Sequence, residues 1–145
     1  MSTIVAALVD TNVLVYRFDA RFPQKQGIAT DLLRQGIADD SVRIAHQAIV
    51  EFVAAVTRPL PDGRPLLSED DARREAEEML TQFTVLWPND AIVRTALRGT
   101  ATYRLRWFDA HMWAYAEYYG LGELLSEDFQ PERMYGAVRV TNPFA

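Results

Sequence analysis

Four acidic side chains lie at positions where burial of a carboxylate costs free energy or where a carboxylate could take part in chemistry. Asp10 follows the apolar run of residues 4–9, and Glu51 lies inside the apolar segment AIVEFVAAV. Asp109 begins the aromatic segment DAHMWAYA, and Asp128 lies in LLSEDF, just after an apolar pair. Carboxylates that are buried close together repel one another, and a hard divalent cation with oxygen ligands removes that repulsion. If the fold brings these four acids together, the sequence predicts a site for a hard divalent cation.

Each of these acids also has a purely structural interpretation. Asp10 and Asp109 could cap the N-terminus of the helix that follows each of them. Glu51 could pair with an arginine or lie on a narrow solvent-facing stripe. The stretch 126–128 could be only a turn, because serine and aspartate are common turn residues. Its Glu127 is a second candidate for the carboxylate that points inward.

The elements that must position these acids follow from the hydrophobic pattern. Short apolar runs predict strands at residues 4–9, 42–45, 84–86, 123–125 and 138–140. Helical spacing of apolar residues predicts helices at residues 11–18, 25–37, 47–56, 68–83, 90–103 and 109–119. This alternation predicts one α/β domain over residues 1–145, a three-layer sandwich whose mostly parallel sheet is covered by helices on both faces. The acids then meet at the carboxyl edge of the sheet if the first and fourth strands are neighbours.

The composition excludes several kinds of site. The 145 residues include no cysteine and only two histidines, which excludes disulfides and thiolate ligands and favours Mg²⁺ or Mn²⁺ over Zn²⁺. The net charge of −5 argues against a broad surface that coats nucleic acid. No apolar run is long enough to cross a bilayer, and the first residues lack the basic segment of a signal peptide. We therefore expect a cytoplasmic protein that does not enter a membrane.

Basic, aromatic and histidine residues surround the acids in the sequence. The basic ones are expected either on the solvated surface or at the cleft, where they could contact a phosphate backbone; they are Arg17, Arg21, Lys25, Arg104 and Arg106. His46 and His111 could be proposed as general bases. They are expected instead at the surface or next to the metal ligands, since a metal mechanism needs neither as a base. The aromatic residues near Asp109 are expected mostly in the core or on a dimer surface, and the alternative is stacking on nucleic-acid bases; they are Trp107, Phe108, Trp113, Tyr115, Tyr118 and Tyr119.

The order of the segments VDTNVLVY, VEF, FDAHMWAYA, LLSEDF and VTNPF resembles that of PIN-domain ribonucleases, especially the VapC-type toxins of bacterial toxin–antitoxin pairs. The resemblance spans residues 4–144. It implies a metal site formed by Asp10, Glu51, Asp109 and Asp128. It also implies supporting roles for Thr11, Asn12 and Ser126. Because the spacing Ser-x-Asp is the commoner one in that family, the resemblance favours Asp128 over Glu127 as the inward acid.

The function that the resemblance implies is a metal-dependent endoribonuclease. One or two Mg²⁺ or Mn²⁺ ions would polarise a phosphodiester of the RNA substrate and activate a water for in-line attack, which leaves a 3′-hydroxyl and a 5′-phosphate. Asp10, Asp109 and Asp128 would hold the metal, and Glu51 would bind it or orient the water. The resemblance also implies a homodimer and inhibition by a cognate antitoxin.

Other functions stay open at this point. One is an RNA-processing PIN nuclease that has no antitoxin, and another is a catalytically silent PIN module that binds RNA or a protein partner. The intact set of four acids favours an enzyme over the silent module. A phosphatase with a phospho-aspartate would require an Asp-x-Asp motif after the first strand, whereas Asp10 is followed by Thr11 and Asn12.

Overall fold

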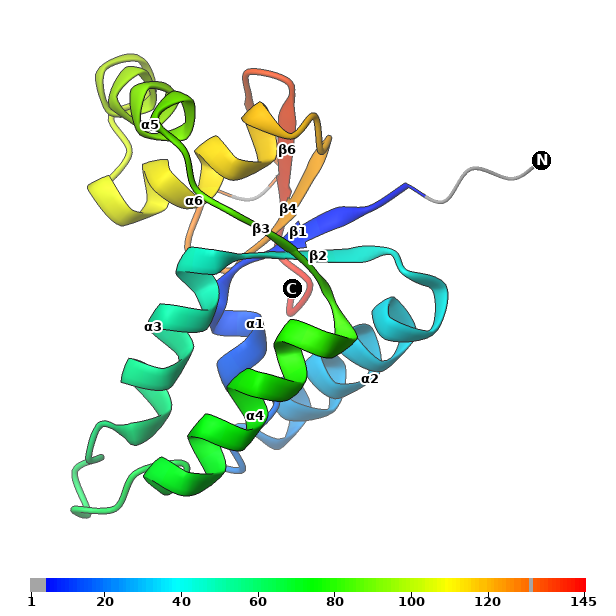
Figure 1. Cartoon of the computed structure of the whole chain (residues 1–145), viewed down its shortest axis with the longest axis vertical. Coiled ribbons are helices and arrows are strands. Elements are labelled where there is room, and N and C mark those ends of the chain that lie inside the picture. Colours follow the sequence, from blue (N-terminus) through cyan, green and yellow to red (C-terminus); the bar gives the residue numbers. More distant parts are fainter. Residues whose placement is uncertain (1–4, 131) are drawn as a thin grey trace.

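A six-stranded sheet forms the centre of the computed structural model, which describes residues 5–130 and 132–145 (Figure 1). Its strands are β1 (Ala7–Val9), β2 (Val42–Ala45), β3 (Thr84–Leu86), β4 (Glu123–Leu125), β5 (Met134–Tyr135) and β6 (Val138–Thr141). The strand order is β3-β2-β1-β4-β6-β5, and every neighbouring pair is parallel except the β5–β6 hairpin. The prediction of a mostly parallel sheet is therefore confirmed.

Helices cover both faces of this sheet. They are α1 (Thr11–Tyr16), α2 (Pro23–Asp39), α3 (His46–Thr57), α4 (Glu69–Gln82), α5 (Asp90–Tyr103) and α6 (Trp107–Tyr118). Figure 1 shows α1 to α4 on one face and α5 and α6 on the other, which confirms the three-layer α/β arrangement. Within the described residues, no helix combines the length and the apolar character that a membrane crossing requires.

The central strands explain why distant segments meet. β1 pairs with β2 on one side and with β4 on the other, with Leu8 opposite Leu124. Both leucines are fully buried, as expected for strands covered on both faces. The β1–β4 pairing extends one residue further, since the Asp10 amide donates to the Leu125 carbonyl at 2.9 Å. The segments that follow β1 and β4 therefore emerge side by side at the carboxyl edge of the sheet.

The predicted boundaries agree with the structure for residues 42–45, 84–86, 90–103 and 123–125 and differ elsewhere. The first strand begins at Ala7, and Ile4 lies outside the described residues. The helix that was expected to begin at Asp109 begins two residues earlier, at Trp107, because Arg106 already has extended backbone and occupies the N-cap position. The short strand β5 was not predicted. It exists through its pairing with β6 across a turn in which Gly136 has a φ of 61°.

Close packing of α5 on α6 fixes the helix that carries Asp109. Gly99 of α5 faces the indole of Trp113 in α6, and a Cβ at this glycine would lie 2.6 Å from Trp113 Cζ3. The indole Nε1 donates to the Tyr135 carbonyl at 2.9 Å. The two helices of this layer, α5 and α6, therefore pack closely on each other, and α6 is hydrogen-bonded to the edge strand β5.

Candidate metal centre

Asp10 lies at the junction of β1 and α1. Its backbone is extended, and its Oδ1 accepts a 2.7 Å hydrogen bond from the Thr11 amide at the N-terminus of α1. Its other oxygen, Oδ2, accepts a 2.7 Å hydrogen bond from Ser126 Oγ. The capping interpretation and the site interpretation are therefore both consistent with this side chain, because one oxygen contacts the helix and the other faces the segment after β4.

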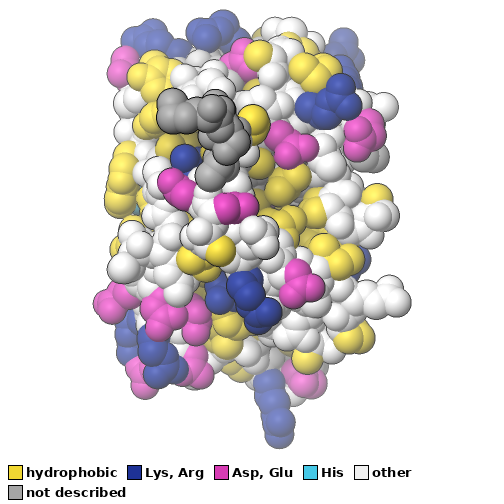
Figure 2. Space-filling view, turned by 90° about the vertical axis from the view of Figure 1, so that its right-hand side faces the viewer, with side chains coloured by type: hydrophobic (Ala, Val, Ile, Leu, Met, Phe, Trp, Pro, Cys, Tyr) yellow, Lys and Arg dark blue, Asp and Glu magenta, His cyan; other side chains and the backbone are white. Residues whose placement is uncertain are grey.

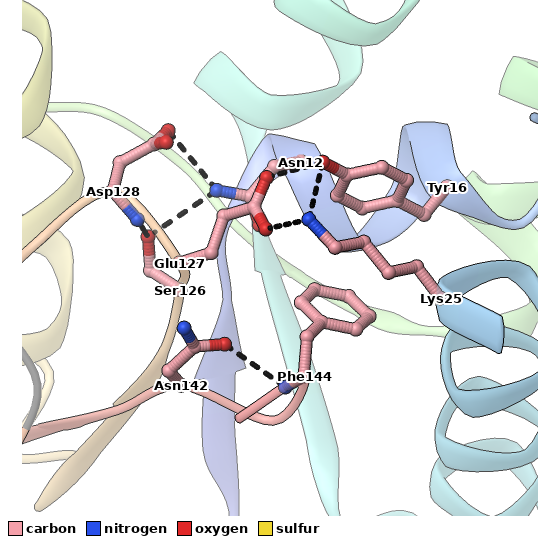
Figure 3. Close-up of polar contacts among 8 residues, drawn as sticks. All are labelled: Asn12, Tyr16, Lys25, Ser126, Glu127, Asp128, Asn142 and Phe144. Atoms are coloured by element: carbon pink, nitrogen blue, oxygen red, sulfur yellow. Dashed lines mark hydrogen bonds and ion pairs between the residues drawn. The ribbon is translucent and has the colours of Figure 1, made fainter. Parts of the chain in front are cut away.

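Asp128 comes from that segment, on the far side of Ser126. Asn12 Nδ2 donates to Asp128 Oδ2 at 3.0 Å, and the Asp128 amide donates to Ser126 Oγ at 3.1 Å (Figure 3). Asn12 Nδ2 also lies 3.4 Å from Ser126 Oγ. The serine hydroxyl therefore connects Asp10 to the backbone of Asp128, while the asparagine holds the Asp128 carboxylate.

Asp109 completes the group from the opposite layer of helices. It lies in the first turn of α6 and is half-buried, so it is not the N-cap residue that one interpretation of the sequence suggested. One carboxylate oxygen from each of Asp10, Asp109 and Asp128 lies within 4.8 Å of the other two. The structure thus brings together three of the four predicted acids, from three segments that are far apart in the sequence.

The three acids form a negative cluster in which no carboxylate has an ion-pair partner among the described residues. Burial raises the pKa of Asp10 from 3.8 to about 7, opposed by the hydrogen bonds from Ser126 and Thr11 and reinforced by the charges of Asp128 and Asp109. Burial, and then the charge of Asp128, raises the pKa of Asp109, and the positive charge of Arg106 opposes this shift. Among the described residues, no lysine, arginine or histidine forms an ion pair with any of the three.

Glu51 lies beside this cluster, outside the group of three. It is half-buried in α3, and its Oε1 accepts hydrogen bonds from Thr11 Oγ1 at 2.8 Å and from Gln47 Nε2 at 3.3 Å. Its negative charge contributes to the raised pKa of Asp109. Within the described part of the chain Glu51 forms no ion pair, so the structure does not support the interpretation that it pairs with an arginine.

The adjacent acids Glu127 and Asp128 point in different directions (Figure 3). Glu127 turns toward α1 and α2, where it accepts hydrogen bonds from Tyr16 Oη and, at 2.9 Å, from Lys25 Nζ. Asp128 is the member of the pair that reaches Asp10 and Asp109. The choice of Asp128 as the inward acid therefore agrees with the geometry.

Two clefts flank Asp128. The first has a volume of about 460 Å³ and lies between α1 and α3; its lining includes Thr11, Asn12, Tyr16, Arg21, Phe22, Glu51, Arg58 and Asp128. The second has a volume of about 480 Å³ and is lined by Arg106, Trp107, Phe108, Asp109 and Asp128. The first cleft combines one acid of the cluster with arginine and the exposed Phe22, and the second combines two acids with arginine and the exposed Trp107 and Phe108.

The basic residues that the sequence placed near the acids have different roles. Arg21 donates to both carboxylate oxygens of Asp19, through Nε at 2.9 Å and Nη2 at 2.8 Å. Lys25 pairs with Glu127 and is therefore not a free cation at the cleft. Arg106 lines the second cleft. Only part of the predicted basic rim is thus available to contact a phosphate backbone.

The residues of the cluster fit a hard divalent cation. Mg²⁺ and Mn²⁺ prefer carboxylate oxygens. In octahedral coordination with bonds of about 2.1 Å, neighbouring ligand oxygens are about 3.0 Å apart and opposite ones about 4.2 Å apart. The three oxygens lie within 4.8 Å of one another, so side-chain rotations can bring them to these distances around one cation. A cation would also offset the repulsion among the three carboxylates, against which, among the described residues, only the charge of Arg106 acts on Asp109.

The match to a family model decides the classification. The model described as the PIN domain matches residues 7–137. The chain belongs to the PIN-domain family. The family predicted from the sequence is therefore confirmed, and no curated protein matches the sequence significantly.

Solved structures of toxins share the fold of this PIN domain. A toxin–antitoxin complex from Klebsiella pneumoniae has a TM-score of 0.66 and 18% identity, and the match covers 95% of this chain and 98% of that chain. VapC20 of Mycobacterium tuberculosis, described as a sarcin–ricin loop cleaving toxin, has a TM-score of 0.63 and 17% identity, with coverage of 85% and 90%. DNA-bound VapBC of Salmonella typhimurium has a TM-score of 0.69 and 10% identity, with coverage of 96% and 98%.

Two residues beside the cluster of this PIN domain were not found from its sequence. Gln47 donates to Glu51 and also, at 3.0 Å, to the carbonyl of Phe108, so it links α3 to the first turn of α6. Tyr16 bonds to Glu127. No local pattern identifies either residue, although Gln47 lies four residues before Glu51, the spacing at which helical side chains meet.

Proposed function

We propose that this PIN domain is a metal-dependent endoribonuclease and the toxin of a toxin–antitoxin pair. The observation that carries the proposal is the meeting of one carboxylate oxygen each from Asp10, Asp109 and Asp128 within 4.8 Å, with no ion pair to any of them among the described residues. Enzymes that hydrolyse phosphodiesters commonly hold divalent cations with such carboxylates.

The four acids have distinct roles in this mechanism. Asp10, Asp109 and Asp128 hold Mg²⁺ or Mn²⁺, which when bound polarises the phosphodiester and lowers the pKa of a water nucleophile. Glu51 accepts the bonds from Thr11 and Gln47 through the same oxygen, Oε1, so its Oε2 is available to orient the attacking water or to bind the metal.

The supporting residues hold these acids in place. Thr11 contributes its amide to Asp10 and its hydroxyl to Glu51. Ser126 donates to Asp10, and Asn12 donates to Asp128. Fixed donors keep the carboxylates oriented before substrate binds, so less reorganisation is needed during the reaction.

The clefts support RNA as the substrate. Arg58 lines the first cleft together with Arg21, which is paired with Asp19, and Arg106 lines the second cleft; Asp128 lines both. Figure 2 shows that on one face of the molecule Lys and Arg side chains are scattered in small groups among Asp and Glu. The few arginines that line the clefts could contact phosphates, and the exposed aromatic rings could stack on bases. This combination suits a single, unpaired nucleic-acid strand.

The same proposal includes a homodimer, a cognate antitoxin and a cytoplasmic location. An apolar cleft of about 440 Å³ opens between α3, α5 and α6, and its lining includes the exposed side chains Val50, Val93, Trp107 and Phe108. An exposed apolar surface of this kind supports association with a second copy of the chain. The similarity of the fold to the Klebsiella pneumoniae toxin–antitoxin complex supports an antitoxin partner.

The activity is tested with purified protein and a labelled single-stranded RNA. We expect cleavage in Mg²⁺ or Mn²⁺, no cleavage in EDTA, and products with a 5′-phosphate and a 3′-hydroxyl. An Asp10→Asn preparation, purified identically, controls for contaminating nucleases. Equal cleavage in EDTA rejects the metal mechanism, and RNA binding without cleavage in either metal identifies a catalytically silent module.

The toxin role needs a separate experiment in cells. Expression of the chain alone should arrest growth, and co-expression of the neighbouring small open reading frame should relieve the arrest. Arrest that no neighbouring gene relieves, together with cleavage in purified form, indicates an RNA-processing nuclease without an antitoxin. Sedimentation of the purified chain tests the dimer, which a monomer at micromolar concentration would contradict.

A further inference from the structure

The segment that carries Asp128 is held from two sides. Ser126 and Asp128 face Asp10, whereas Glu127 between them points away, toward α1 and α2 (Figure 3). Glu127 Oε2 accepts a 2.9 Å hydrogen bond from Lys25 Nζ, and its Oε1 accepts one from Tyr16 Oη. Lys25 Nζ also donates to Tyr16 Oη at 3.3 Å. Lys25, Tyr16 and Glu127, here called the Glu127 clamp, thus join the loop after β4 to α1 and α2.

Aromatic rings enclose the lysine of the clamp. Lys25 Nζ lies 4.9 Å from the ring centre of Tyr16, 5.7 Å from that of Phe22 and 5.9 Å from that of Phe144. These distances are within the range of cation–π attraction. Phe144 also packs edge-on against Tyr16, with ring centres 5.0 Å apart. The C-terminal segment therefore covers the clamp, and the ammonium group has favourable contacts on several sides.

The clamp is more sheltered from water than the ion pairs on the exposed face of α4. The side chains of Lys25 and Glu127 are 37% and 20% exposed, whereas those of Arg73 and Asp70 in α4 are 63% and 86% exposed. Exposed pairs contribute little to stability because water and salt screen them. An ion pair that is partly buried, and whose carboxylate accepts hydrogen bonds through both oxygens, holds its two side chains in fixed positions better than an exposed pair does.

The position of Asp128 requires such a restraint. Its carboxylate is exposed and lies beside the carboxylates of Asp10 and Asp109, which repel it. On the side of the cluster, Asn12 is the side chain that donates to it. Without a restraint on the neighbouring residue, repulsion would favour rotation of Asp128 toward solvent in the absence of a cation.

We propose that Lys25 and Tyr16 are positioning residues, which act through Glu127 to hold Asp128 beside Asp10 and Asp109 and so set the affinity of the site for a divalent cation. The proposal rests on the proposed metal-dependent function. It assigns Lys25, the one lysine of the sequence, to the site geometry and not to contact with the RNA. Neither Lys25 nor Tyr16 touches the metal in this account.

The test measures the binding of Mn²⁺ to the full chain by titration calorimetry, without RNA. Lys25→Met keeps an unbranched chain among the aromatic rings, and Glu127→Gln keeps the shape of the carboxylate. We expect each to weaken Mn²⁺ binding about 10-fold or more, as removal of groups that orient metal ligands commonly does. Arg73→Met, which breaks an exposed pair on α4, is the matched control and should bind Mn²⁺ like the parent.

A double variant tests whether the two residues act together. If Lys25 acts through Glu127, then Lys25→Met combined with Glu127→Gln should weaken Mn²⁺ binding no more than the stronger single change. Additive effects would overturn this coupling. If Lys25→Met does not fold, Tyr16→Phe keeps the ring packing and removes only the hydroxyl, and it should weaken Mn²⁺ binding in the same direction.

Melting temperatures in EDTA separate positioning from a general structural role. Unchanged Mn²⁺ affinity in Lys25→Met and Glu127→Gln, whatever their melting temperatures, overturns the clamp while leaving the proposed nuclease intact. A parent chain that binds no Mn²⁺ rejects the metal-dependent function, and the clamp proposal with it. Weaker Mn²⁺ binding in folded variants, with parent-like binding in Arg73→Met, supports the clamp.

Discussion

Ser126 Oγ donates a 2.7 Å hydrogen bond to Asp10 Oδ2, across the junction of two parallel strands whose sequences are more than a hundred residues apart. Both side chains are buried, and the same hydroxyl accepts from the backbone amide of Asp128. One small side chain therefore connects two of the three clustered acids. Asp10 consequently has a role in the packing of the sheet edge as well as in the proposed chemistry.

Asp10→Asn should preserve the fold and abolish function. An asparagine oxygen can still accept from the Thr11 amide, and asparagine caps helices about as well as aspartate does. It cannot supply the charge that binds Mg²⁺. We expect loss of RNA cleavage, of Mn²⁺ binding and of growth arrest at unchanged protein level. RNA cleavage at the parental rate would show that Asp10 is only a helix cap.

The metal-free protein should lose stability as the pH rises toward neutrality. Burial raises the pKa of Asp10 from 3.8 to about 7, so between these values the native state holds a proton that the unfolded chain has released. The free energy of unfolding therefore falls with rising pH across this interval and levels off above it. Relative to Asp10→Asn in EDTA, the parent should lose about 2 kcal/mol between about pH 5.5 and about pH 8.

Urea unfolding of both proteins at the two pH values measures this effect. The comparison with Asp10→Asn removes the contributions of the other titrating groups that the two proteins share. Addition of Mn²⁺ at the higher pH should restore stability to the parent and leave Asp10→Asn unchanged. A difference between the proteins that does not vary with pH would contradict the raised pKa.

Glu51→Gln should remove activity without loss of stability. The Gln oxygen can still accept from Thr11 Oγ1, and removal of one negative charge relieves repulsion with Asp109. If Glu51 orients the water or binds the metal, RNA cleavage should fall by about 100-fold or more. The exposed Glu78→Gln in α4 serves as a control with parental activity. Retained activity in Glu51→Gln, or a clear fall in its melting temperature, would reject the assignment.

Gly99→Ala should destabilise the packing of α5 on α6. The added Cβ would lie 2.6 Å from Trp113 Cζ3, so the indole or the helix must shift, at a cost of about 1–3 kcal/mol. Gly27→Ala in α2 is the control, because nothing lies within 4 Å of its Cβ and alanine favours a helix. Thermal melting of both variants checks the contrast. Equal melting temperatures would show that the two helices adjust freely.

The sequence by itself determined the type and order of nearly all the elements. Runs such as 42–45 and 123–125 are short and mostly apolar, and helices such as 90–103 repeat their apolar residues at helical spacing. These patterns depend on neighbours within one element, which is why they can be read locally. Met134–Tyr135 is too short to show a pattern, and it becomes a strand only by pairing with β6.

Only the tertiary structure decided how the acids are arranged. The sequence identified Asp10, Glu51, Asp109 and Asp128, but their grouping depends on β1 lying next to β4, which is set by hydrogen bonds between distant segments. The structure left Glu51 beside the group of three and turned Glu127 toward Lys25. Glu127 and Asp128 lie in bends after the end of β4, so the direction of each acid depends on the residues that pack against this segment, and the local sequence does not contain this information.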